Sequence, residues 1–192
     1  KHHTLITCTD CFDFVIGAVH SLVKKGECFS VDYTKDMLLD VTHRLYGGEF
    51  LELCADFYAQ SVRSALRERV QIAAHFDLVT KYNKDGEMVN ENDPEYLKLA
   101  YAALEQILDK RPDLYFEINT GVMARAGKAY PYPSPSLLRF LCDNGAKLVL
   151  TGDCHRTSHL GVGYDRVREI LSEQKHPRLY MLTEKGFEPV KL

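Results

Sequence analysis

Histidine and aspartate side chains follow three short apolar runs in this sequence. The first run ends at His20, the second at His75, and the third leads into Asp153 and His155. Imidazole nitrogens and carboxylate oxygens suit Zn, Mn and Fe as ligands. A single histidine after a strand is more often packed or solvated than bound to a metal, but four candidates at equivalent strand ends indicate a shared site. The sequence therefore predicts a metal cluster, and such clusters hydrolyse phosphate esters.

The pair formed by Asp153 and His155 is the strongest of these signals. Side chains two positions apart in an extended strand lie on the same face, so both should point into one site. Cys154 lies between them and should point to the opposite face, which favours a packing role for its thiol.

Two cations and two further polar residues extend the candidate site. Lys81 follows the second apolar run, and Arg125 lies in a long segment after Glu117 and Asn119. Arginine binds phosphate by paired hydrogen bonds and lysine binds it as a point charge. An exposed cation is the more common interpretation of Lys81. The spacing of Glu117 and Asn119 puts both on one strand face, where they could contact a polar substrate or pair with the backbone.

Apolar periodicity and turn residues predict an alternation of strands with helices. Strands are expected at residues 12–20, 70–76, 114–118, 147–151, 178–183 and 187–191, and helices at residues 34–46, 49–69, 94–110, 136–144 and 164–173. The segments 83–93 and 121–136 are predicted to be loops. This alternation is typical of a parallel α/β fold. Ligands carried on such strands meet at the carboxyl ends of the sheet.

Length and composition predict one globular domain over residues 1–192. Hydrophobic residues make up 45% of the chain and charged residues 27%. The net charge of −3 indicates no nucleic-acid partner, and no apolar run is long enough to predict a membrane partner. The scattered cysteines favour a reduced, cytoplasmic protein. Cys8 and Cys11 have the spacing of half a zinc site, but no second pair completes it. The oligomeric state is left open.

Several segments together resemble a known family. They are 12–20, 75–83, 117–121, 132–135 and 152–155, and they occur in this order. Their combination resembles histidinol-phosphatases of the polymerase-and-histidinol-phosphatase (PHP) superfamily, from about Phe12 to Leu192. The resemblance implies a distorted (β/α)7 barrel with a trinuclear site for divalent metals such as Zn, Mn or Fe. It also implies that a small phosphorylated substrate, L-histidinol phosphate, is hydrolysed in histidine biosynthesis.

The resemblance also implies roles for single residues. His20 and His75 would ligate one metal, Asp153 a neighbouring metal and His155 a third. Asp153 would also accept a proton from the attacking water, and His155 could protonate the leaving alkoxide. The remaining residues would bind substrate: Lys81 and Arg125 its phosphate, and Glu117 and Asn119 its imidazole and ammonium groups.

The sequence departs from the family at its front. The His-x-His strand, the Thr-Asp-His strand end and the bridging Glu of the family do not appear. We therefore expect only the C-terminal four or five βα units of the barrel, with an exposed first strand and no activity from this chain alone. Two alternatives stay open. The protein could hydrolyse another small phosphate monoester, or it could be a non-catalytic metal-binding domain.

Overall fold

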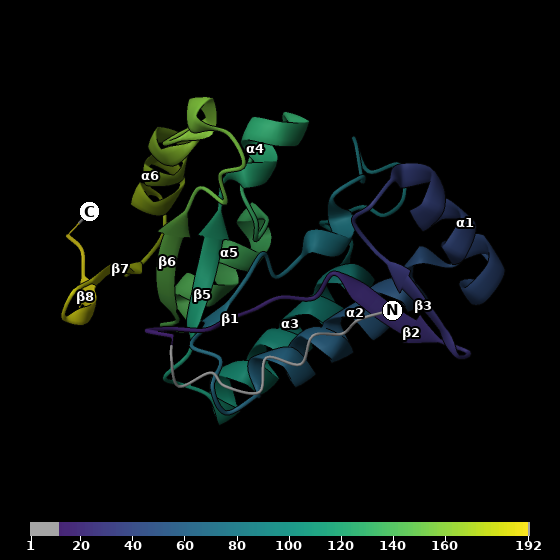
Figure 1. The fold of residues 1–192 in the computed structure, drawn as a ribbon, viewed down its shortest axis with the longest axis horizontal. Helices are drawn as coiled ribbons and strands as arrows, with labels where there is room; N and C mark the ends of the chain where they lie inside the picture. Colours follow the sequence, from purple (N-terminus) through teal and green to yellow (C-terminus); the bar gives the residue numbers. More distant parts are fainter. Residues whose placement is uncertain (1–11, 192) are drawn as a thin grey trace.

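The architecture is a mixed α/β fold built around one sheet of six strands. The structure, a computed structural model, describes residues 12–191, so Cys8 and Cys11 lie outside the described residues. The strand order is β1-β4-β5-β6-β7-β8, in which the first five of these strands pair in parallel and β8 is antiparallel (Figure 1). The strands are β1 (Ile16–Gly17), β4 (Ile72–Ala73), β5 (Tyr115–Asn119), β6 (Lys147–Thr151), β7 (Arg178–Thr183) and β8 (Gly186–Pro189).

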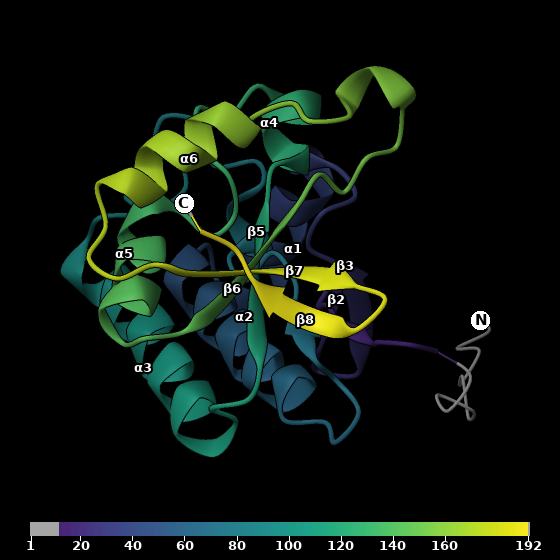
Figure 2. The ribbon, with the colours of Figure 1, turned by 90° about the vertical axis from the view of Figure 1, so that its left-hand side faces the viewer.

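Helices cover the outer side of this sheet. Seen along the sheet in Figure 2, α3, α5 and α6 form an arc on one side of the strands. The α-helices are α1 (Lys35–Tyr46), α2 (Phe50–Ala65), α3 (Pro94–Lys110), α4 (Gly121–Ala126), α5 (Pro135–Asp143) and α6 (Tyr164–Ser172). Two 3₁₀ turns add η1 (Leu78–Thr80) and η2 (Thr157–His159).

Side-chain caps explain why α1 and α3 begin where the sequence predicts. The Thr34 hydroxyl accepts a hydrogen bond from the Met37 amide, and the Asp93 carboxylate accepts one from Glu95. Each satisfies an amide that the first helical turn leaves unpaired. Pro94 adds a φ angle suited to the first helical position.

The core lies between the helices and the sheet. Leu53 and Phe57 of α2 and Leu104 of α3 are 0–1% exposed, as are Phe116 and Ile118 of β5. Burying a side chain of this size contributes about 1.5–3 kcal/mol. This packing holds β5 rigidly, and β5 is the strand that lies under the site described below.

The predicted strand 12–20 is mostly irregular backbone in the structure. Only Ile16–Gly17 pairs as β1, and a two-stranded antiparallel hairpin follows, formed by β2 (Ser21–Lys24) and β3 (Glu27–Ser30). Lys25 and Gly26 join its strands with φ angles of 50° and 82°. Two consecutive positive φ angles are typical of a tight hairpin turn. His20 therefore follows β1 by three residues and lies at the start of the hairpin.

The segment 121–136 was predicted to be a loop, and that expectation is wrong for its first part. Residues Gly121–Ala126 form α4, which ends at Gly127 with a φ of 65°. The predicted helix 49–69 also ends early, at Ala65. Positions of helix ends depend on contacts made by the last turn, which local patterns do not contain.

The described sheet is open, with β1 at one edge and β8 at the other. Ile16 of β1 is 44% exposed, as expected for an apolar edge. An apolar cleft of about 650 Å³ lies beside this edge, lined by residues of β1, β6, β7, β8 and α6. Closure into a barrel stays a prediction. Among residues 12–191, no helix has the length and apolar character needed to cross a membrane.

Candidate functional site

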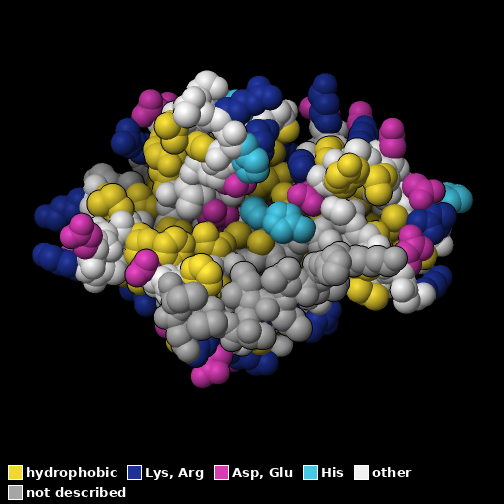
Figure 3. All heavy atoms as spheres, in the orientation of Figure 1, with side chains coloured by type: hydrophobic (Ala, Val, Ile, Leu, Met, Phe, Trp, Pro, Cys, Tyr) yellow, Lys and Arg dark blue, Asp and Glu magenta, His cyan; other side chains and the backbone are white. Residues whose placement is uncertain are grey.

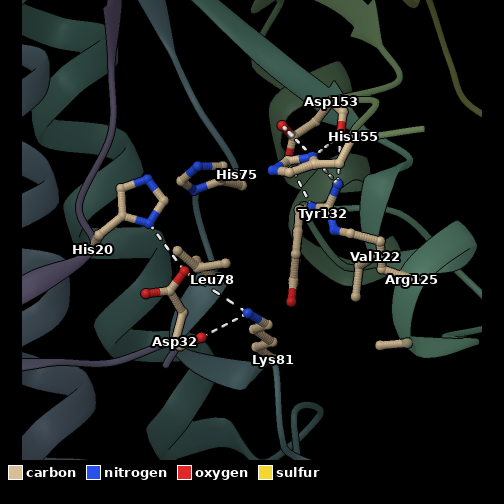
Figure 4. Close-up of a pocket in the computed structure, with 11 residues that line it drawn as sticks. His20, Asp32, His75, Leu78, Lys81, Val122, Arg125, Tyr132, Asp153 and His155 are labelled. Atoms are coloured by element: carbon tan, nitrogen blue, oxygen red, sulfur yellow. Dashed lines mark hydrogen bonds and ion pairs between the residues drawn. The ribbon is translucent and has the colours of Figure 1, made fainter. Parts of the chain in front are cut away.

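A pocket of about 390 Å³ lies at the carboxyl ends of β1, β4 and β6. Imidazole and carboxylate groups gather there in a hollow on one face of the molecule (Figure 3). The structure brings together all four predicted ligands and both predicted cations, and adds two residues that the sequence did not assign. The predicted residues are His20, Lys81, His75, Arg125, Asp153 and His155; the additional ones are Asp32 and Tyr132 (Figure 4).

One wall of the pocket carries a pair of histidines. The ring centroids of His20 and His75 lie 4.9 Å apart. His20 Nδ1 is 3.1 Å from Asp32 Oδ2, so this carboxylate fixes one ring nitrogen. His75 is 8% exposed, and its Nδ1 has no hydrogen-bond partner. A buried nitrogen without a partner is costly unless a ligand or water satisfies it.

The opposite wall joins Asp153 and His155 through Arg125. Arg125 Nη2 donates to Asp153 Oδ2 at 2.7 Å, and Nη1 lies 3.1 Å from His155 Nδ1. The guanidinium also donates to the backbone oxygen of Asp153. The guanidinium of Arg125 therefore occupies the space between two predicted metal ligands, where its positive charge takes the place that a metal ion would have.

The expectation that Asp153 and His155 lie on one face of a strand is wrong, although both side chains face the pocket. Strand β6 ends at Thr151, and Asp153 has a φ of 42°, in the left-handed region. Their common direction results from a turn rather than from strand alternation. Cys154 is exposed, and its thiol donates to the backbone oxygen of His159.

Glu117 and Asn119 lie beneath the pocket and are not among its lining residues. They share one face of β5 as predicted, and Asn119 Nδ2 donates to Glu117 Oε2 at 3.0 Å. The Glu117 carboxylate also accepts from the His75 amide at 2.8 Å and from Thr151 Oγ1 at 2.6 Å. One buried carboxylate thus links the ends of β4, β5 and β6.

Lys81 is tied to the segment that contains Asp32. Its ammonium donates to the Asp32 backbone oxygen at 2.6 Å and lies 3.8 Å from Asp32 Oδ2. The side chain is 29% exposed, so the ammonium still borders the pocket.

Neighbouring charges set the protonation of these groups. Burial works to raise the pKa of Asp32, but hydrogen bonds from His20 and Ser30 outweigh it and lower the pKa to about 2. The same contact with Asp32 raises the pKa of His20. Burial lowers the pKa of His75, which favours its neutral form. Burial also works to raise the pKa of Asp153, but the hydrogen bond and positive charge of Arg125 outweigh it, so the pKa is lowered.

The residue types at the pocket fit a divalent metal. The neutral His75 ring, with its unpartnered Nδ1, is the kind of donor that transition metals bind. His20 and His75 lie close enough to share one ion, whereas Arg125 lies between Asp153 and His155. Within residues 12–191, no three His, Cys, Asp or Glu side chains gather closely enough to hold a metal ion.

Asp32 is the site residue that sequence reasoning missed. It follows β3 by two residues, with Val31 fully buried between them. An acidic residue just after a strand is a weak signal, and the hairpin that brings it back to His20 was not predicted. Tyr132 belongs to a segment that carries the family resemblance, but no role had been assigned to it.

Comparisons with known proteins agree with the resemblance found in the motifs. No family model matches the chain. A Schizosaccharomyces pombe protein named "Probable histidinol-phosphatase" is 23% identical over 175 residues, which cover 91% of this chain and 54% of that protein. The Saccharomyces cerevisiae "Histidinol-phosphatase" is 21% identical over 182 residues, which cover 84% of this chain and 52% of that protein.

A solved structure extends the agreement to the fold. The crystal structure of the "putative histidinol phosphatase hisK" from Listeria monocytogenes superposes with a TM-score of 0.67 at 18% identity, over 80% of this chain and 57% of that one. The chain thus spans about half the length of the curated relatives it matches. It is similar to histidinol-phosphatases in sequence and has a fold of the same kind.

Proposed function

We propose that this chain carries the phosphate-binding and catalytic side chains of a metal-dependent phosphomonoesterase that hydrolyses L-histidinol phosphate to L-histidinol and phosphate in histidine biosynthesis. The observation that supports it most is the meeting of His20, His75, Asp153 and His155 in one pocket with Arg125. Similarity to proteins named histidinol-phosphatase supports the same substrate.

The proposed cofactors are Zn, Mn or Fe ions, three in the complete site of the family. His20 and His75 would hold one ion, Asp153 a second and His155 a third. A bound divalent cation would supply a hydroxide at neutral pH and neutralise charge on the phosphate. Further ligands would have to complete each of these three sites.

Arg125 is the proposed binding group for the phosphate. Its planar guanidinium can form two parallel hydrogen bonds with phosphate oxygens. Because it already contacts Asp153 and His155, a phosphate held there would lie beside both residues. Lys81 would add a positive charge from the opposite wall.

Asp153 and His155 are the proposed proton carriers. The lowered pKa of Asp153 keeps it ionised, so its carboxylate can accept a proton from the attacking water. Arg125 can only donate, so in its contact with His155 Nδ1 that nitrogen accepts and the proton of the neutral ring lies on Nε2. Nε2 would protonate the leaving alkoxide when it does not hold the third ion. Beneath them, Glu117 and Asn119 hold the strand ends in place. Their contact with the imidazole and ammonium groups of the substrate stays a prediction.

A second candidate is a non-catalytic domain that binds one metal or none. It is favoured by the lack of any three-residue metal group within residues 12–191. If the protein is a phosphatase, another small phosphate monoester is an alternative substrate.

Phosphate release distinguishes these candidates. The protein is supplied with Mn, Zn or Fe and assayed against L-histidinol phosphate and a panel of other small monoesters. In protein that carries the complete ligand set of the family, we expect release from histidinol phosphate that is lost in Asp153→Asn and kept in Asp165→Asn, a matched change on the exposed side of α6. Release from a different ester alone would correct the substrate. No release from any ester, with at most one metal per chain, would support the non-catalytic domain.

A further inference from the structure

Asp32 reaches the pocket from a segment that the rest of the structure holds firmly. Ser30 Oγ donates to Asp32 Oδ1 at 2.9 Å, while Oδ2 lies 3.1 Å from His20 Nδ1. Both carboxylate oxygens thus have partners on the chain. Val31, the residue before Asp32, is fully buried and anchors the segment in the core.

The backbone around Asp32 is held by two side chains that lie beside it. The Lys81 ammonium donates to the Asp32 carbonyl oxygen at 2.6 Å. The Tyr82 hydroxyl lies 2.8 Å from that oxygen and 2.7 Å from the carbonyl oxygen of Tyr33. Two side chains from the segment after η1 therefore clamp the backbone that carries Asp32. A surface ion pair between mobile side chains has no such support.

This arrangement has a chemical consequence for His20. A neutral imidazole carries one N–H, and a carboxylate can only accept hydrogen bonds. The contact with Asp32 therefore places the proton of neutral His20 on Nδ1. The other nitrogen, Nε2, is left with a free lone pair on a ring that lines the pocket (Figure 4). Orientation of a ligating histidine by a carboxylate is a general way to raise its basicity.

We propose that Asp32 is a positioning residue of the site, which locks His20 as the Nδ1–H tautomer and presents Nε2 to the pocket. The use of that lone pair by a divalent metal rests on the proposed function. The tautomer itself does not, because it follows from chain contacts alone. Lys81 then has a structural task, holding Asp32 in place, in addition to its proposed contact with phosphate.

The first test measures the tautomer directly in metal-free protein. Long-range ¹H–¹⁵N correlation spectra, recorded at a pH where His20 is neutral and assigned with His20→Gln, distinguish a protonated from an unprotonated ring nitrogen. We expect Nδ1–H and bare Nε2 in the native protein. In Asp32→Ala the Nε2–H form should become the larger population. Asp32→Asn should keep much of the native tautomer, because its amide oxygen can still accept from Nδ1. A native protein with Nε2–H, or an Asp32→Ala spectrum unchanged from native, would overturn the proposal.

Metal affinity provides the second readout. Zn²⁺ competition with a chromophoric chelator should show roughly 10–100-fold weaker binding in Asp32→Ala. Asp36→Ala removes an exposed carboxylate four residues later, in the first turn of α1, and should leave the affinity unchanged. Equal losses in both variants would show a general charge effect and contradict positioning. If the tautomer changes as expected but native protein binds no Zn²⁺ and releases no phosphate, the proposed function fails while the role of Asp32 stands.

Discussion

Arg125 is the residue on which phosphate binding depends most. In the structure its guanidinium donates to Asp153 and lies beside His155, and both of these residues face the pocket. A bound phosphate would compete for the same N–H groups. Before substrate binds, Arg125 therefore holds Asp153 and His155 in position. After substrate binds, some of its N–H groups can donate to the phosphate instead.

Arg125→Ala should lower kcat/KM for histidinol phosphate by about 10–100-fold or more, because hydrogen bonds to charged groups contribute roughly 1.5–3 kcal/mol each. Stability should change little, since the side chain is about one-third exposed. Arg125→Lys should recover only part of the loss because lysine cannot bind in a planar, two-pronged manner. Arg166→Ala, on the exposed side of α6, is the control. Steady-state kinetics and thermal unfolding measure both effects. An unchanged kcat/KM in Arg125→Ala would exclude Arg125 from the site.

Asp77 has no role in the proposed chemistry, yet it is fully buried. Burial, followed by the nearby Glu91, raises its pKa to about 7. Its Oδ2 accepts from the Ser134 amide at 2.8 Å, while Oδ1 has no partner. Between the ordinary pKa of 3.8 and the folded value, the native state holds a proton that the unfolded state has lost. The contribution of Asp77 to the free energy of unfolding therefore falls as the pH rises from its ordinary pKa to its folded pKa.

Asp77→Asn should remove this dependence, because an amide carries no charge and can still accept from Ser134. The native protein should lose up to ~4 kcal/mol between pH 4 and pH 7 from this residue, and the variant should show a correspondingly flatter profile. Urea unfolding at several pH values gives both profiles. Parallel profiles for the two proteins would mean that Asp77 is already ionised when folded at low pH.

Among the structural elements, α4 is the one that positions a functional side chain most directly. Arg125 lies in its last turn and folds back over Gly121, its first residue. A Cβ added at Gly121 would lie 2.6 Å from Arg125 Nη1, which is too close. Glycine at the start of α4 thus makes room for the guanidinium.

Gly121→Ala should displace Arg125 and reduce histidinol phosphate turnover without loss of stability, since alanine favours a helix by up to about 1 kcal/mol over glycine. Gly17→Ala is the matched change in β1. There the new Cβ would lie 2.8 Å from Val70 Cγ1, and overpacking should cost about 1–3 kcal/mol. Kinetics together with thermal unfolding separate the two effects. A Gly121→Ala enzyme with native turnover would show that Arg125 does not need this space.

The elements that could be predicted from the sequence are those whose signals are local. The helix after Asp93 and Pro94 has a capping residue and a regular apolar face, and the structure confirms it. The β2–β3 hairpin lies between the predicted strand 12–20 and the predicted helix 34–46, in a stretch for which no element was expected, although Lys25-Gly26 marks its turn. The predicted ligands converge because they follow strands of one parallel sheet. Asp32 could not be found in this way, because its contact with His20 spans a hairpin and depends on tertiary packing.

At the scale of the whole molecule, the open sheet exposes apolar surface. Ile16 on β1 and Met181 and Leu182 on β7 are 39–59% exposed and border the same cleft. An edge strand with apolar side chains is a template for pairing with another chain.

We therefore expect the 192-residue chain to elute in size-exclusion chromatography as an oligomer or aggregate. Ile16→Lys should shift it toward the monomer, because a charge on an edge strand opposes pairing. Val23→Lys introduces the same charge at a 69% exposed position of β2 and should leave the elution unchanged. A monomeric native chain would show that the exposed edge does not drive association.

The two walls of the pocket are held to the sheet with unequal strength. Two residue pairs join β1 to β4, whereas five join β5 to β6. Local opening requires less free energy where fewer hydrogen bonds and buried contacts must break. Amide protons of β1 should therefore exchange with solvent well before those of β5 and β6. A ligand that touches both walls would slow amide exchange most in β1. Part of its binding free energy would be spent on ordering the segment around His20.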